Sequence, residues 1–361
     1  MLLITKEILF VLFCVSCVLF VFSPVQKPRV DTIGGNKLIS FNHILLFLLV
    51  GLLVFAAVVK PPTMADYSSY VRLFQGIDQN ERMEPAFGII VKLLNIVDGN
   101  NYYLMFIVFA LLSIPLRVFL YNKFSPLIWG TIIVYLSNYY ILHDLIQIRA
   151  AVASALLILL VYFSYKRKLG LFIITYLVSL SFHYSSIVFI VIWFITTTNN
   201  PRKYFLFLLF SYLLYFAQYS MSSLLSYIPI SSISSLLSGY AGRESYENNV
   251  FNLIQILRIA LAFFFFYNLN SKQNVYPWYV CFLKVYIVGL CFLPLFSSLS
   301  GVALRMMELF VSCEPIVIPV GFLISFKKKL FCKAAILAYA VLFFNIYYNA
   351  TNYWDVDWFN F

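Results

Sequence analysis

Residues 126–165 read PLIWGTIIVYLSNYYILHDLIQIRAAVASALLILLVYFSY, and this stretch decides the fold of the chain. It holds two apolar runs, at 126–143 and 147–165, and each is long enough to cross a bilayer as a helix. The segment HDLIQIR, residues 143–149, lies where the two runs meet. Charges at membrane depth are expensive unless they face a polar cavity or a partner. The stretch therefore predicts a helical membrane protein with a polar site at the mouth of a span.

Composition extends this prediction to the whole chain. Of the 361 residues, 63% are hydrophobic and only 11% are charged, and the mean hydropathy is +0.90. A soluble protein needs more charge on its surface, and the continuous apolar runs do not alternate as they would in a β-barrel. We predict an all-α, polytopic integral membrane protein with about 12 transmembrane helices, in a range of about 10–12. The net charge of +11 lies in short clusters between spans, which indicates cytoplasmic loops and not nucleic-acid binding.

The predicted spans follow from the apolar runs. They cover about 6–23, 38–59, 101–121, 126–143, 147–165, 169–182, 184–197, 203–219, 250–268, 278–297, 303–325 and 330–349. The first run lacks a small-residue cleavage site, so we interpret it as a retained helix and not a signal peptide. The runs 169–182 and 184–197 are short, and form either two thin spans or a broken helix pair around a polar cavity.

Loop charges predict the orientation. The positive-inside rule places one set of cation-rich loops in the cytoplasm, with Lys27, Arg29, Lys37, Arg117, Lys123, Lys166, Arg167, Lys168, Arg202, Lys203, Lys272, Lys327, Lys328, Lys329 and Lys333. With twelve spans both termini are external. We expect a single transmembrane domain over 1–361, with two large external segments at 60–100 and 218–249. The first contains an amphipathic or re-entrant helix from Ala86 to Val97.

Cofactor and metal motifs are missing from the sequence. The short cytoplasmic loops hold no Gly-rich phosphate loop, and the three histidines have no metal-ligand spacing. The six cysteines lie in or near apolar runs, which predicts free thiols and neither a disulfide nor a metal site. We therefore expect neither a cofactor nor a metal.

Two candidate clusters lie in the segment 60–100. Asp66 and Tyr70 share a face if the chain is helical there, and with Tyr67 they suit sugar hydroxyls and the apolar faces of sugar rings. The alternative is an N-cap aspartate beside interfacial tyrosines. Glu84, just before Pro85, is either a helix-capping residue or a catalytic acid or base.

Two more clusters lie at the ends of spans. Arg149 at a helix start opposes the helix dipole, so an acid or an anionic ligand must hold it, and its forked donors suit phosphate oxygens. His143, Asp144 and Gln147 precede it, and the alternative to ligand binding is a structural pair of Arg149 with Asp144. His183 lies between two short spans, where it is either a hydrogen-bonded core residue or a substrate-orienting base.

The last candidates are cations in the second half of the chain. Arg243 lies in the external segment 218–249, Arg258 in the following span, and Arg305 three residues before Glu308. Arg305 and Glu308 form either an ion pair within the membrane or part of a binding site. Guanidinium groups of Arg149, Arg258 and Arg305 around one cavity would stabilise a diphosphate leaving group.

Several of these motifs resemble the EpsG-like branch of the Wzy polysaccharide polymerases. The resemblance covers about residues 1–325 and rests on a Lys-rich loop after the first span, Asp66-Tyr67-x-x-Tyr70, Glu84-Pro85-x-Phe87, Gln147-x-Arg149-x-x-x-Ala153, Phe182-His183-Tyr184-Ser185-Ser186 and Arg305. It implies a fold like that of the GT-C glycosyltransferases and a metal-independent reaction on undecaprenyl-diphosphate-linked oligosaccharide repeat units at the external face of the bacterial inner membrane. Further partners implied are membrane lipid, a chain-length regulator and a flippase, with no nucleic acid.

The resulting hypothesis is a polymerase for O-antigen, lipopolysaccharide, capsule or exopolysaccharide. Arg149, Arg305, Arg258 and Arg243 would hold the donor diphosphate. The base would be one of Asp66, Glu84, Asp144 and His183. The rival hypotheses are a flippase for lipid-linked oligosaccharides, which needs cations in both halves of the membrane, an O-antigen ligase with the same donor chemistry, and an acyltransferase, which needs an inward acyl-CoA site.

Overall fold

The computed structural model describes residues 2–26, 41–77, 83–195, 201–217, 249–269, 276–350 and 354. Within these ranges all regular secondary structure is helical: α-helices, one π-helix and one 3-10 helix. The prediction of an all-α protein is confirmed. The physical reason is the length of the apolar runs, since a helix satisfies every backbone hydrogen bond within its own segment.

The chain divides into two compact units, each described by itself. Unit 1 comprises Met1–Leu159, Leu177–Tyr184 and Glu314–Phe361, and unit 2 comprises Leu160–Tyr176 and Ser185–Cys313. The prediction of a single transmembrane domain stays a prediction. The predicted external segment 218–249, apart from its last residue, lies outside the described residues.

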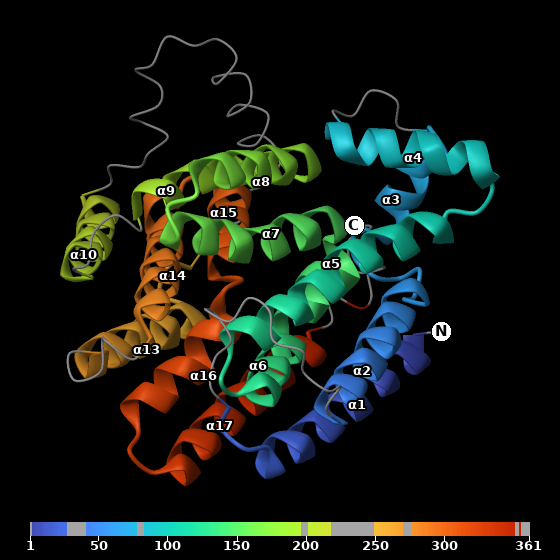
Figure 1. The fold of residues 1–361 in the computed structure, drawn as a ribbon. Coiled ribbons are helices and arrows are strands. Elements are labelled where there is room, and N and C mark those ends of the chain that lie inside the picture. The colour runs from blue at the N-terminus through green and yellow to red at the C-terminus, as the bar shows by residue number, and fades with distance from the viewer. Residues whose placement is uncertain are drawn as a thin grey trace. The chain divides into compact units, whose positions relative to one another are not determined.

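Unit 1 is a bundle of long apolar helices with two short helices at one end. Its elements are α1 (Leu2–Phe22), α2 (Phe41–Val58), α3 (Tyr67–Phe74), α4 (Pro85–Asp98), α5 (Tyr103–Phe124), α6 (Ile128–Val134), the π-helix η1 (Tyr135–Ile146), the first part of α7 (Ile148–Tyr165), the end of α8 (Leu169–Phe182), α16 (Glu314–Ser325) and α17 (Lys329–Tyr348). α2 packs along α5, α1 packs against α6, and α17 packs against α6 and η1 (Figure 1). Stacked rings of Phe13 and Phe344, with centroids 3.9 Å apart, join α1 to α17.

Unit 2 is built around one central helix. α14 (Pro277–Leu295) packs against α10 (Arg202–Phe216), α13 (Leu253–Leu269) and α15 (Ser300–Val311). Nearly all side chains of α14 are buried. A 3-10 helix, Tyr184–Ile190, begins at the last residue of the segment Leu177–Tyr184 of unit 1. It leads in unit 2 into the short helix α9 (Val191–Ile195), which also contacts α14.

Six helices of the described chain are long and apolar enough to cross a membrane, namely α1, α2, α5, α7, α14 and α17, and α15 with α16 makes a seventh if the pair is one span. The protein is therefore an integral membrane protein, as predicted. The predicted span 126–143 is divided into α6 and η1, and the predicted span 303–325 into α15 and α16. α8, the segment Tyr184–Ile195 and α13 are shorter apolar helices, so the total of twelve spans stays a prediction.

Close packing of α14 on α15 depends on Gly289. A Cβ built at this position would lie 2.7 Å from Cβ of Phe310 and 3.3 Å from the backbone nitrogen of Val311. We expect Gly289→Ala to lower the free energy of unfolding by about 1–3 kcal/mol, because the two helix backbones must separate to admit the methyl group. Thermal or denaturant unfolding in detergent would measure the change.

Gly51 in α2 is the matched control, since a Cβ there meets no atom within 4 Å. Gly51→Ala should leave stability unchanged or raise it by up to about 1 kcal/mol, because alanine is the better helix former. Equal losses in the two variants would show that the approach of α14 to α15 is not what limits stability.

Candidate functional site

The candidate site in unit 1 is built around the ion pair of Arg149 and Glu84. Arg149 Nη1 donates to Glu84 Oε2 at 2.5 Å. The guanidinium lies over the rings of Tyr70 and Phe87, with distances to the centroids of 5.3 and 5.4 Å. A guanidinium over two ring faces is stabilised by the negative charge of those faces, in addition to its carboxylate partner. Arg149, at the start of α7, therefore has the acidic partner that its position at a helix N-terminus demanded.

His183 approaches the same carboxylate from the other side. Its Nδ1 lies 3.4 Å from Glu84 Oε1, and both side chains are largely buried. The residue follows the end of α8, where its backbone N–H donates to the carbonyl of Ser179. Next in the chain, Tyr184 donates from its hydroxyl to the carbonyl of Met83 at 3.3 Å. The end of α8 is thus held against the start of α4.

Glu84 is an ionised carboxylate at neutral pH. Burial by itself raises its pKa, but the imidazole of His183 and the positive charge of Arg149 outweigh that effect and hold the pKa below its ordinary value of 4.5. Its backbone is extended at the N-cap of α4, and its side chain makes no hydrogen bond to that cap. Glu84 is thus the N-cap residue of the helix that Pro85 opens, as one of the two interpretations had it, while its carboxylate faces Arg149 and His183.

Lys60, after the end of α2 and at the start of the predicted external segment 60–100, is a site neighbour that was not among the predicted site residues. It is 1% exposed, and its Nζ donates to the carbonyl of Leu145 at 2.7 Å. The ammonium lies 4.1 Å from the Phe106 ring centroid and 5.9 Å from that of Tyr70. Burial lowers its pKa to about 7, although the charges of Asp66 and Asp144 oppose this shift. The sequence signal was a lysine directly at the end of an apolar run and before two prolines.

The cluster of Asp66, Tyr67 and Tyr70 is only partly directed inward. Asp66 has a φ of 63° and precedes the first turn of α3, so the condition for sharing a helical face with Tyr70 is not met. Tyr67 and Tyr70 are buried, whereas Asp66 is exposed. Tyr67 contacts the ring of Phe106, with centroids 5.1 Å apart. Of the three, Tyr70 is the residue that borders Arg149.

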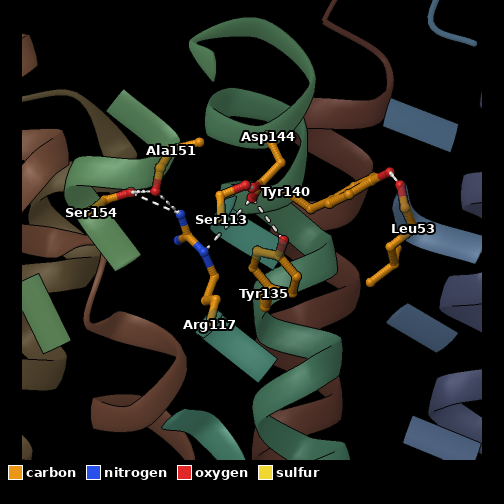
Figure 2. Close-up of polar contacts among 8 residues, drawn as sticks. All are labelled: Leu53, Ser113, Arg117, Tyr135, Tyr140, Asp144, Ala151 and Ser154. Carbon is orange, nitrogen blue, oxygen red and sulfur yellow. Dashed lines mark hydrogen bonds and ion pairs between the residues drawn. The ribbon is translucent and has the colours of Figure 1, made fainter. Parts of the chain in front are cut away.

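His143 and Asp144 lie buried on η1 and not at the exposed mouth of a span. Asp144 accepts hydrogen bonds from Ser113 at 2.6 Å and Tyr135 at 2.7 Å (Figure 2). Its ionic partner is Arg117, with Nε 3.8 Å from Oδ2. The alternative interpretation, in which Asp144 pairs with Arg149, is therefore wrong.

Arg117 also corrects the orientation argument. It was counted among the cations of a cytoplasmic loop, yet it lies inside α5 and is fully buried. Arg117 and Ser113 are four residues apart, so they share one face of α5 and both reach Asp144. The sequence pattern does not distinguish the two situations, because an apolar run followed by a cation is the same whether that cation is solvated in a loop or paired inside a helix.

The remaining candidates belong to other parts of the chain. Gln147 separates η1 from α7 and is half-buried. In unit 2, Arg258 is 3% exposed on α13, while Arg305 is exposed and Glu308 half-buried on α15. Arg243 lies outside the described residues. Unit 1 thus brings together Glu84, Arg149, His183 and Tyr70, and the roles of the unit 2 cations stay predictions.

The lowered pKa of Glu84 predicts that the stability of the fold depends on pH. Because the folded value lies below the ordinary value of 4.5, Glu84 stabilises the fold above pH 4.5, and this contribution is lost as the pH falls through the folded value. We expect the stability difference between wild type and Glu84→Gln to be constant near neutral pH and to shrink on acidification to about pH 3. Thermal unfolding across this range measures it.

Asp98→Asn, at the exposed far end of α4, is the matched control and should follow the wild-type curve. A difference between wild type and Glu84→Gln that does not change with pH would contradict an ionised, paired Glu84.

Comparison with known proteins gives the family of the chain. Comparison with curated proteins and with solved structures gives no match. The model of the EpsG family matches residues 43–360, a range that includes Glu84, Arg149 and His183. The family suggests a membrane protein of the polysaccharide-polymerase kind, a glycosyltransferase in general terms. The match confirms the resemblance drawn from the sequence motifs, and the chain belongs to the EpsG family.

Proposed function

We propose that this protein is a polysaccharide polymerase of the external face of the bacterial inner membrane. It moves a growing glycan from undecaprenyl diphosphate onto a hydroxyl of the next lipid-linked repeat unit. The family match supports the general class of reaction. The observation that carries the specific proposal is the contact of Glu84 with both Arg149 and His183 beside Tyr70. This small cluster combines a phosphate-binding cation with a paired acid and imidazole.

Arg149 is the proposed contact to the donor diphosphate. Its planar guanidinium presents several donors to phosphate oxygens. The carboxylate of Glu84 accepts from part of this donor set, and an arriving diphosphate competes for it. As the bond between the sugar anomeric carbon and the diphosphate oxygen breaks, negative charge grows on the leaving group, where Arg149 stabilises it. Arg258, Arg305 and Arg243 are further candidates for the same diphosphate.

Glu84 and His183 are the proposed base. The acceptor hydroxyl attacks the anomeric carbon and loses its proton to one of these two groups, while undecaprenyl diphosphate departs with the electron pair of the broken bond. Asp66 is a less direct candidate because it is exposed outside α3. Asp144 is enclosed by Ser113, Tyr135 and Arg117 and has no exposed surface from which to meet a sugar hydroxyl.

Tyr70 and Phe87 supply the apolar surroundings of the cluster. Their rings lie against the Arg149 guanidinium, and such apolar surroundings strengthen its interaction with an anion. Tyr67, the first residue of α3, remains a candidate for packing on a sugar ring. We further propose about twelve spans, a GT-C-like arrangement and no metal or cofactor, in line with the sequence analysis.

Purified protein in liposomes, supplied with undecaprenyl-diphosphate-linked repeat units, should produce a ladder of glycan lengths. Arg149→Ala should reduce polymer formation by about 100-fold or more, because it removes charge stabilisation of the leaving group. Gel analysis of the lipid-linked products would measure this.

Arg202→Ala, at the exposed start of α10, is the matched control and should leave the ladder intact. No ladder from correctly folded wild-type protein would refute polymerisation. Movement of the intact substrate between leaflets without any ladder would favour the flippase instead.

A further inference from the structure

Arg117 and Asp144 form a buried ion pair that the proposed chemistry does not use. Both side chains are 0% exposed. Two guanidinium nitrogens, Nε and Nη1, have no hydrogen-bond partner among the described residues. The charge of Asp144 is therefore what chiefly offsets the charge of Arg117. A buried pair of this kind is costly to assemble and is seldom explained by stability alone.

Arg117 is paired with Asp144 by charge, whereas its hydrogen bonds are made to α7. Nη2 donates to the carbonyl of Ala151 at 2.9 Å and to Oγ of Ser154 at 2.8 Å. Ser154 in turn donates to the same Ala151 carbonyl at 3.0 Å. Figure 2 shows the guanidinium between Asp144 on one side and Ala151 and Ser154 on the other. One side chain of α5 thus contacts both η1 and α7.

The residues that Arg117 contacts lie on either side of Gln147, which separates η1 from α7 and precedes Arg149 by two residues. The backbone N–H of Gln147 still bonds to the carbonyl of Leu142, in the five-residue spacing of a π-helix. The carbonyl of Gln147 accepts from Ala151 and so begins the α-helical spacing of α7. Arg149 is two residues from Gln147 and two from Ala151. The direction in which α7 leaves η1 therefore decides where the Arg149 guanidinium lies.

Two more hydrogen bonds hold η1 itself. Lys60 donates to the carbonyl of Leu145, and Tyr140 donates from its hydroxyl to the carbonyl of Leu53 at 2.6 Å. Both contacts tie η1 to the α2 region. A π-helix of 12 residues is unusual, since such spacing is mostly confined to single turns. Arg117 joins η1, held in this way, to α7 across Gln147 and so favours one angle between them.

We propose that Arg117 and Asp144 are positioning residues for Arg149. They hold the junction of η1 and α7 so that the Arg149 guanidinium lies against Glu84 and close to His183. Neither touches substrate. The proposal rests on the proposed function for its catalytic consequence, but its geometric part concerns only the pairing of Glu84 with Arg149 and is tested separately.

The geometric test measures how strongly Glu84 and Arg149 are coupled. Thermal unfolding of Glu84→Gln, Arg149→Gln and the double variant gives the coupling as the departure from additive shifts in Tm. The same cycle is then built in a Ser154→Ala background, which deletes one contact of Arg117 with little change in helix propensity. We expect the coupling to fall in Ser154→Ala and to return in Ser154→Thr, which restores a hydroxyl.

Gln255→Met is the control background. Gln255 is buried in unit 2, where its side chain donates to the carbonyl of Leu290, so the coupling in unit 1 should be unchanged. Coupling of full size in Ser154→Ala and in Arg117→Lys would overturn the proposal whatever the polymerase assay shows. If Arg117→Lys does not fold, Ser154→Ala alone decides.

The catalytic test measures turnover. In the liposome assay Ser154→Ala and Arg117→Lys should lower kcat by about 10-fold to 100-fold, since a misplaced catalytic group is costly to the reaction. Ser154→Thr should recover turnover, and Gln255→Met should resemble wild type. A loss of folded protein with kcat unchanged would show a merely structural role. If wild type makes no polymer, the proposed function fails, and the coupling measurement still decides the positioning.

Discussion

A charge withdrawn from water must find an opposite charge or several hydrogen bonds, and this constraint organises unit 1. Arg117 is balanced by Asp144 and Arg149 by Glu84, while Lys60, with its lowered pKa, donates to a carbonyl and lies against two aromatic rings. Each partner lies on a different segment of the chain, so every pairing joins helices that are distant in sequence. Apolar packing is non-directional and would allow helices to rotate or slide. The ion pairs give unit 1 specific contacts that such movements would break.

The same constraint accounts for the place of the candidate site. A helix break exposes backbone groups that need partners, and the break at Gln147 lies between two sets of buried polar contacts. Asp144 and Leu145 are held before it, and Ala151 and Ser154 after it. Arg149 therefore extends from a supported junction and not from a loop. A cation held in this way loses little freedom when an anion binds, which favours electrostatic stabilisation by preorganised groups.

Glu84 connects the buried frame to the proposed chemistry. It belongs to a short helix that begins with Pro85, and its carboxylate faces a guanidinium and an imidazole at once. Balanced by Arg149 it is a stable anion, and released from Arg149 by a competing diphosphate it would be a base next to His183. One carboxylate could thus link donor binding to activation of the acceptor. That link depends on the proposed function and on the short distances within the cluster.

The sequence by itself determined the class of the protein, the approximate positions of its helices and most members of the candidate site. Long apolar runs leave no soluble alternative, and residues such as Glu84, Arg149 and His183 stood out because polar groups are rare in such a chain. The local sequence pattern did not determine which charged residues pair with each other. Arg117 was interpreted as a loop cation, Asp144 as a candidate base or alternatively a partner of Arg149, and Lys60 was given no role. Partners such as Arg149 and Glu84, 65 residues apart, or Lys60 and Leu145, 85 residues apart, meet only after the helices have packed. A helical repeat specifies a face without specifying what lies against it. The tertiary structure alone decided that Asp144 pairs with Arg117, that Glu84 pairs with Arg149, and that the helix is interrupted at Gln147.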